Sequence, residues 1–147
     1  MSGSDPGRPV FLVTGATSGI GRAAALRLAE HGRVLVGARD PEAGETVRAE
    51  IAGRGGEAEV ALADLSVEAQ VRDLAARIAQ REARLDVLVN NAGVFCPRRR
   101  VSPDGRELTL AVNYLAPVLL CHDLLPLLRD SAPSRIVNVA SMEHRLG

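Results

Sequence analysis

Short apolar runs alternate along the chain with longer stretches in which apolar residues recur at helical spacing. Runs typical of buried strands occupy residues 10–13, 33–38, 57–62, 85–89 and 136–140. Strands that alternate with helices indicate βαβ units with right-handed crossovers, and therefore a parallel sheet that helices cover on both faces. The predicted fold class is an α/β doubly wound parallel sheet of about five strands.

Capping residues and prolines set the expected helix boundaries. Asp40, which a proline follows, fits the N-cap of the second helix, and Ser66 fits the N-cap of the third. Residues 104–130 form a long apolar pattern at helical spacing. Pro117 and Pro126 lie inside this pattern, so we expect kinks or a break in the fourth helix.

The stretch that organises the chain is residues 10–22, where the first apolar run leads into a glycine-rich turn. An Ala- and Leu-rich helix is predicted to follow over residues 19–31. Gly15, Gly19 and Gly21 give the spacing T-G-x-x-x-G-x-G. Such a strand–turn–helix unit points unpaired backbone N–H groups and the positive end of the helix at a phosphate. The stretch favours nucleotide binding; a glycine-rich turn without a ligand is the alternative.

Polar residues follow the predicted strands at their carboxyl ends. In parallel sheets these ends meet along one edge, and ligands bind just beyond it. The side chains are therefore expected to lie together, which favours nucleotide binding over the ligand-free turn. They belong to Thr14, Arg39, Asp64, Asn90 and Ser141.

Arg39 ends the second predicted strand, where dinucleotide-binding sheets meet the adenine ribose. An acidic residue there bonds the ribose hydroxyls, whereas an arginine accommodates a 2′-phosphate. The guanidinium fork suits a phosphate, and Ala38 brings no carboxylate to repel it. The predicted cofactor is NADP, with NAD as the other candidate. A solvated surface arginine, or a charge near the helix that starts at Asp40, is the alternative.

Other polar positions each have two interpretations. Asp64 either accepts a hydrogen bond from an adenine amino group or only ends a loop. Asn90 and Asn91 suit a tight turn, and their position before Ala-Gly at a strand end is more specific than a lone turn residue. Asn113 lies in an apolar helix, where its amide either has a partner or caps a kink. The arginines at 98–100 are assigned to a solvated loop.

Composition narrows the class of protein. The chain has 147 residues, 46% of them hydrophobic, which suits one globular domain with its own core. Eighteen basic and eighteen acidic residues balance, and aromatic residues make up 2% of the chain, so nucleic acid is not an expected partner. Every basic residue is an arginine, so no step within this chain can use a lysine amine.

Cysteines, histidines and the N-terminal segment set the expected compartment. Cys96 and Cys121 do not form a disulfide framework, so a reducing cytoplasm is the simplest setting. The histidines are not clustered like metal ligands, and no metal is expected. Residues 1–8 are expected to be a flexible tail without a signal-peptide core, and residues 9–147 a single domain. No apolar run is expected to span a bilayer.

Taken in order, these motifs resemble those of the short-chain dehydrogenases/reductases, NAD(P)-dependent oxidoreductases with a Rossmann fold. Parts of the chain look most like the branch of retinol dehydrogenases and WW-domain oxidoreductases, which often prefer NADP and act on lipophilic aldehydes, ketones or alcohols. The resemblance implies a Rossmann-type sheet, incomplete here, and hydride transfer between nicotinamide and a carbonyl or alcohol carbon. The matching segments are residues 14–21, 64–65, 90–93, Asn113 and 135–141, and the branch features lie in 37–40 and 131–139.

The resemblance also implies roles for individual residues. Asn113 would match the catalytic asparagine that holds a water in the proton relay. Ser141 would match the catalytic serine that hydrogen-bonds the substrate carbonyl and stabilises the developing oxyanion. The backbone of residues 90–93 would line the adenosine half of the cofactor. The residues expected to bind the cofactor are Thr14, Gly15, Ser18, Gly19, Ile20, Gly21, Arg39, Asp64, Leu65, Asn90, Ala92 and Gly93.

The chain departs from the family pattern at the catalytic Tyr-x-x-x-Lys motif. Its one tyrosine, Tyr114, directly follows Asn113 and has no lysine four positions on. Because the positioned acid–base group is missing, we expect no oxidoreductase turnover from the chain alone. Three explanations stay open: a truncated, N-terminal portion of an ordinary enzyme, a non-catalytic nucleotide-binding or interaction protein, or one half of a split enzyme.

Partners follow from the same comparison. The expected substrate is a small carbonyl compound or alcohol, which is lipophilic if the branch assignment holds. The last predicted strand, 136–140, would leave one edge of the sheet unpaired, which invites association. The long helical pattern of 104–130 resembles a helix that family members use to dimerise. A homo-oligomer and a C-terminal partner polypeptide are therefore both considered.

Overall fold

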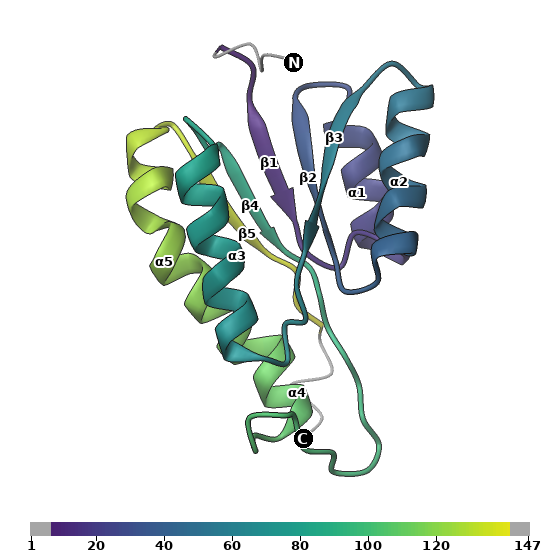
Figure 1. Ribbon diagram of the computed structural model, residues 1–147, viewed down its shortest axis with the longest axis vertical. Coiled ribbons are helices and arrows are strands. Elements are labelled where there is room, and N and C mark those ends of the chain that lie inside the picture. Colours follow the sequence, from purple (N-terminus) through teal and green to yellow (C-terminus); the bar gives the residue numbers. More distant parts are fainter. Residues whose placement is uncertain (1–6, 142–147) are drawn as a thin grey trace.

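The structure is a computed structural model that describes residues 7–141. Its described strands form one parallel sheet in the order β3-β2-β1-β4-β5 (Figure 1). The order reverses beside β1, because the chain passes from β3 at one edge to β4 on the other side of β1. Such a reversal is where ligands bind in open α/β sheets. The strands are β1 (Val10–Val13), β2 (Arg33–Ala38), β3 (Glu57–Leu62), β4 (Val87–Asn90) and β5 (Arg135–Asn138).

Helices cover both faces of the sheet, as the hydrophobic pattern predicts. Helices α1 (Gly19–Leu28) and α2 (Pro41–Gly53) lie on one face, and α3 (Glu68–Arg81) and α5 (Ala116–Asp130) on the other (Figure 1). Alternate residues of β1 enter the two cores. Phe11 packs in the α1/α2 core, and Leu12 packs in the α3/α5 core. The predicted α/β doubly wound, Rossmann-type architecture is confirmed.

The three central strands end within two residues of one another in the register of the sheet. Val13 on β1 pairs with Val36 on β2 and with Val89 on β4. The residues that follow these three positions therefore meet at one edge of the sheet, and the ligand-binding candidates lie among them. This register is the main contribution of the fold to the site.

Of the two predicted N-caps, one is confirmed and the other is wrong. Asp40 is the N-cap of α2, and its side chain accepts a hydrogen bond from the Glu42 N–H at 2.9 Å. The prediction for Ser66 is wrong, because α3 starts at Glu68 with Val67 at its N-cap. Ser66 is buried, and its hydroxyl donates to the Asp64 carboxylate instead. Helix α1 ends at Leu28, before the predicted end at residue 31, because residues 29–31 form the turn into β2.

The long fourth helix begins later than predicted and is not broken by its prolines. It consists of α4 (Leu108–Leu110), a π-helical turn η1 (Ala111–Leu115) and α5. Glu107 caps its start, because its carboxylate accepts the N–H groups of Thr109 and Leu110. The irregular turn lies directly before Pro117, at the start of α5, whereas Pro126 lies inside that helix.

Residues Leu108–Asp130 form a helix that is long and apolar enough to cross a membrane. From sequence, no apolar run is expected to span a bilayer, and this helix is a candidate by length and composition alone. A core helix meets the same criteria of length and composition, and one stripe of this helix packs in the α3/α5 core. The buried residues of that stripe are Ala116, Leu120, Leu124 and Leu128.

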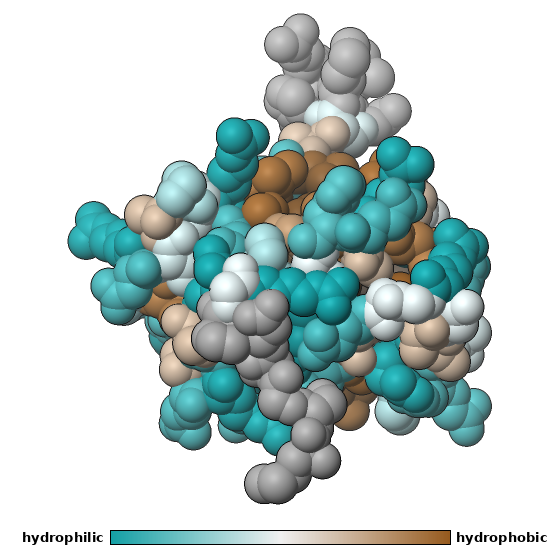
Figure 2. All heavy atoms as spheres, turned by 90° about the horizontal axis from the view of Figure 1, so that it is seen from above, coloured by the Kyte–Doolittle hydropathy of each residue, from teal (hydrophilic) through white to brown (hydrophobic). Residues whose placement is uncertain are grey.

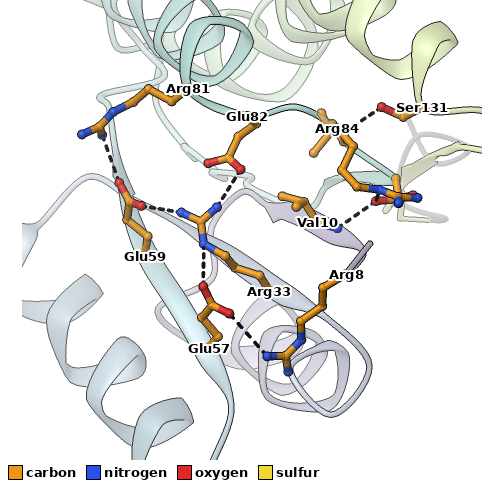
Figure 3. Close-up of polar contacts among 11 residues, drawn as sticks. Arg8, Val10, Arg33, Glu57, Glu59, Arg81, Glu82, Arg84 and Ser131 are labelled. Carbon is orange, nitrogen blue, oxygen red and sulfur yellow. Dashed lines mark hydrogen bonds and ion pairs between the residues drawn. The ribbon is translucent and has the colours of Figure 1, made fainter. Parts of the chain in front are cut away.

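Charged residues gather where the strands begin, opposite the ligand-binding edge. Arg33, at the start of β2, forms ion pairs with Glu57 and Glu59 of β3 and with Glu82 after α3 (Figure 3). Arg8 also pairs with Glu57, while residues 1–6 of the predicted tail lie outside the described residues. Viewed from this end, hydrophilic residues cover most of the surface, with smaller hydrophobic areas between them (Figure 2).

Candidate functional site

A cleft of about 660 Å³ lies at the carboxyl ends of the strands, where the order of the sheet reverses. The cleft brings together residues from every loop that was expected to contribute to a cofactor site. Contact between these residues and a ligand stays a prediction. Among the predicted cofactor residues, those that line the cleft are Thr14, Gly15, Ser18, Gly19, Ile20, Arg39, Asp64, Leu65, Ala92 and Gly93.

Thr14 joins the ends of the two central strands. Its side chain is buried, and its Oγ1 accepts hydrogen bonds from the N–H groups of Asn91 and Ala92, both at 3.0 Å. The same hydroxyl donates to the Val89 carbonyl at 3.3 Å. A threonine at this position therefore ties the glycine-rich turn after β1 to the turn after β4.

The glycine-rich turn leaves the start of α1 open toward the cleft. Gly19 has a φ of 53°, which favours glycine, and a Cβ there would meet no atom within 4 Å. Ser18 is the N-cap of α1, and its side chain makes no capping hydrogen bond. The N–H groups of the first helical turn have no partner within the helix and suit an anion.

Gly21 does not line the cleft but lets the turn close. A Cβ on Gly21 would lie 2.2 Å from the Gly15 carbonyl oxygen and 2.3 Å from Asn91 Nδ2. Any side chain would separate α1 from the turn below it. The contribution of Gly21 is therefore close backbone packing, which supports the residues that do face the cleft.

The two adjacent asparagines have different positions. Asn91 lines the cleft, and its Nδ2 donates to the carbonyls of Thr14 and Gly15, each at 3.1 Å. Asn90 is buried and does not line the cleft; its Nδ2 donates to Asn138 Oδ1 at 2.9 Å. From sequence, Asn90 is named among the cofactor-binding residues and Asn91 is included only in the 90–93 backbone, although the Asn91 side chain braces the glycine-rich turn.

Arg39 lies on the rim of the cleft at the end of β2 and is exposed. Its guanidinium has no hydrogen-bond or ion-pair partner among residues 7–141, so its donors are available to a ligand. The neighbouring Asp40 carboxylate is held by the start of α2. This arrangement leaves one free positive charge where the sequence analysis predicts a 2′-phosphate.

Asp64 lines the same end of the cleft and is also part of a local turn. Its Oδ1 accepts hydrogen bonds from the Ser66 N–H at 2.9 Å and from the Ser66 hydroxyl at 2.7 Å. The carboxylate therefore orders the loop and borders the cleft, and the hydrogen bond from an adenine amino group stays a prediction.

Asn113 lies in the π-helical turn and has a partner for its amide. Its Oδ1 accepts the Val94 N–H at 2.8 Å, and its Nδ2 donates to the Val94 carbonyl at 2.9 Å. Asn113 itself does not line the cleft, whereas Val94 does. Asn113 therefore acts on the cleft through the loop that follows β4.

Ser141 is the remaining residue predicted to be catalytic, and Tyr114 is the tyrosine that does not match the catalytic motif. Ser141 is exposed and lies three positions after the last residue of β5, outside the cleft lining. Tyr114 is 61% exposed and follows Asn113 in the π-helical turn. Across residues 7–141 no group of acidic, histidine or cysteine side chains is arranged to hold a metal ion.

Several cleft residues carry no signal that sequence reasoning could use. They are small or apolar, and their role depends on which strand ends meet. Thr17, between the glycines, is the exception that the motif itself could have indicated. The residues are Thr17, Gly37, Ala38, Ala61, Ala63, Leu74, Val94, Val112 and Val139.

The residues present fit a dinucleotide on structural grounds. The open position at Gly19 and the unsatisfied first turn of α1 suit a pyrophosphate. The unpaired Arg39 lies on one rim of the cleft, while Val94, Val112 and Val139 line it with apolar surface. The cleft volume lies in the range of small-molecule sites in general.

Comparison with known proteins identifies relatives over most of the chain. A model of the short chain dehydrogenase family matches residues 9–147. The chain is 46% identical to human retinol dehydrogenase 11 over 146 residues, which cover 97% of this chain and 45% of that protein. It is 43% identical to mouse retinol dehydrogenase 14, covering 100% of this chain and 49% of that protein. The chain therefore spans about half the length of these relatives.

Solved structures of short-chain oxidoreductases also match most of the chain. A metagenomic short-chain oxidoreductase in complex with NADP matches with a TM-score of 0.82 and 37% identity, over 91% of this chain and 62% of that one. The angucycline C-6 ketoreductase LanV with bound NADP matches with a TM-score of 0.80 and 34% identity, over 95% of this chain and 57% of that one. The predicted resemblance to the retinol-dehydrogenase branch is confirmed, and the chain belongs to the short-chain dehydrogenase family.

Proposed function

We propose that this chain is the NADP-binding portion of a short-chain dehydrogenase/reductase. The observation that carries the proposal is the convergence of Gly19, Arg39 and Asn91 at one cleft. The start of α1 offers N–H groups to a pyrophosphate, and Arg39 offers an unpaired guanidinium to a 2′-phosphate. The NADP-bound structures of related enzymes support the same cofactor.

The parent reaction we propose is hydride transfer between the nicotinamide and a carbonyl or alcohol carbon. When bound, the nicotinamide supplies or accepts the hydride. The residues of this chain bind the cofactor and orient the substrate. Asn113 holds the loop at Val94, and Ser141 donates its hydroxyl to the substrate oxygen and so stabilises negative charge that develops there.

The substrate class follows from relatives and from the lining of the cleft. The curated relatives include retinol dehydrogenases, and Val94, Val112 and Val139 give the cleft apolar surface. We therefore assign the substrate to lipophilic carbonyl compounds or alcohols.

The two cysteines are both free thiols, which supports a reducing compartment such as the cytoplasm.

A second candidate function rests on β5. All four residues of β5 are exposed, and β5 pairs with β4 alone among the described strands. Ile136 and Val137 are 40% and 43% exposed. An apolar edge strand favours pairing with another strand, so a partner polypeptide that also supplies the Tyr-x-x-x-Lys motif would make a split enzyme.

Calorimetric titration of the 147-residue protein with NADPH and with NADH tests the proposal. We expect saturable binding that favours NADPH, and Arg39→Ala should remove the preference while NADH binding persists. No binding of either nucleotide would reject the cofactor assignment for this chain. Carbonyl reduction by the chain alone would instead contradict the expectation that it is inactive without a partner.

A further inference from the structure

Gly44 lies at a tight contact between α2 and the sheet. It is buried in the first turn of the helix. A Cβ on Gly44 would lie 2.8 Å from Val60 Cγ1 on β3 and 3.0 Å from Ala38 Cβ on β2. The start of α2 therefore packs on β2 and β3 at a distance that leaves no room for a methyl group.

Gly44 also lies close to both sequence neighbours of Arg39. Ala38 precedes Arg39, and its Cβ is one of the atoms that a Cβ on Gly44 would approach too closely. Asp40, which follows Arg39, accepts the Gly44 N–H on its carbonyl at 3.0 Å. Gly44 therefore lies close to the residues on either side of Arg39.

We propose that Gly44 is a positioning residue for Arg39, and that it sets the preference of the cleft for an adenosine ribose that carries a 2′-phosphate. This inference rests on the proposed cofactor function. A side chain at position 44 would lift the start of α2 from Val60 and tilt the backbone that presents the guanidinium. Bidentate hydrogen bonds between a guanidinium and a phosphate depend on geometry, so a small tilt costs affinity for the phosphorylated nucleotide first.

The experiment is a calorimetric titration of the full chain with NADPH and, separately, with NADH. For Gly44→Ala we expect the ratio of the two dissociation constants to fall about tenfold toward unity, the equivalent of losing one charge-assisted hydrogen bond. NADH binding should change less than NADPH binding, because NADH has no 2′-phosphate. A purely structural role would instead weaken both nucleotides equally.

Gly53→Ala is the matched control. Gly53 belongs to the same helix, and a Cβ there would meet nothing within 4 Å. This variant should keep the wild-type preference. Adding Val60→Ala to Gly44→Ala removes the Cγ atoms that the new methyl would strike, and should restore most of the preference.

Val60→Ile enlarges the other side of the same contact and covers the case in which Gly44→Ala does not fold. It should lower the NADPH preference as well. An unchanged preference in a folded Gly44→Ala or Val60→Ile variant would overturn the inference while leaving the cofactor assignment intact. If the wild-type chain binds neither nucleotide, the cofactor assignment fails and the inference falls with it.

Discussion

Asn113 and Val94 are joined by two hydrogen bonds, one in each direction between the asparagine amide and the valine backbone. The pair connects the π-helical turn before α5 to the loop that leaves β4. Because Val94 lines the cleft and Asn113 does not, the asparagine shapes the cleft from outside it.

Removing this pair should loosen the loop after β4. Asn113→Ala deletes both hydrogen bonds at an exposed position, so we expect the free energy of unfolding to fall by about 1 kcal/mol. Hydrogen exchange at the Val94 amide should accelerate, which nuclear magnetic resonance can measure. Asn113→Asp keeps the acceptor for the Val94 N–H and should protect that amide better than alanine does. Equal exchange in all three proteins would contradict the role of Asn113.

Asn91 should matter for both stability and nucleotide binding. Asn91→Ala removes the two hydrogen bonds to the carbonyls of Thr14 and Gly15, and we expect a loss of about 1–2 kcal/mol in urea unfolding. NADPH binding should weaken, because the glycine-rich turn loses its brace. Asn138→Ala is the control, since it removes an amide contact with Asn90 on the β5 side. That control should leave NADPH affinity near the wild-type value.

Gly21→Ala should destabilise the chain through steric overlap. The new Cβ would lie 2.2 Å from the Gly15 carbonyl oxygen, which belongs to the backbone and cannot rotate away. We expect a loss of about 1–3 kcal/mol in the free energy of unfolding. Gly53→Ala places the same methyl in open space and should cause no loss. Comparable stability of the two variants would show that the turn yields without cost.

Asp86 should make stability depend on pH. Burial by itself raises the pKa of this carboxyl, but hydrogen bonds from Arg84 and the Val10 N–H, with the charge of Arg84, outweigh burial and lower it below 3.8. At pH values between the folded and the unfolded pKa, this carboxyl binds fewer protons in the folded chain than in the unfolded chain. Its stabilisation is therefore complete above about pH 5 and is lost as the pH falls through the folded pKa.

Asp86→Asn tests this dependence. The variant should be less stable than the wild type at pH 7 by about 1–3 kcal/mol, because the charge-assisted bonds are gone. The difference should shrink as the pH is lowered toward 3. Chemical unfolding at a series of pH values measures both quantities, and a difference that stays constant with pH would contradict the lowered pKa.

The sequence determined the layers of the fold and about half of the residues that line the cleft. Period and length of the apolar runs separated strands from helices, and the glycine spacing marked the turn before α1, because these are local properties of the chain. The positional rule for the carboxyl ends of strands indicates Arg39 and Asp64 from the sequence alone. Both line the cleft.

Tertiary structure decided the rest, since it depends on contacts between distant segments. Asn90 and Asn91 are adjacent and chemically identical, but Asn90 ends β4 and bonds Asn138 on β5, whereas Asn91 lies just beyond the strand and bonds the glycine-rich turn. The closeness of Gly44 to Val60 arises likewise from packing of α2 against the sheet. Local sequence specifies which elements form, but the atoms that each side chain meets are fixed only when those elements pack together.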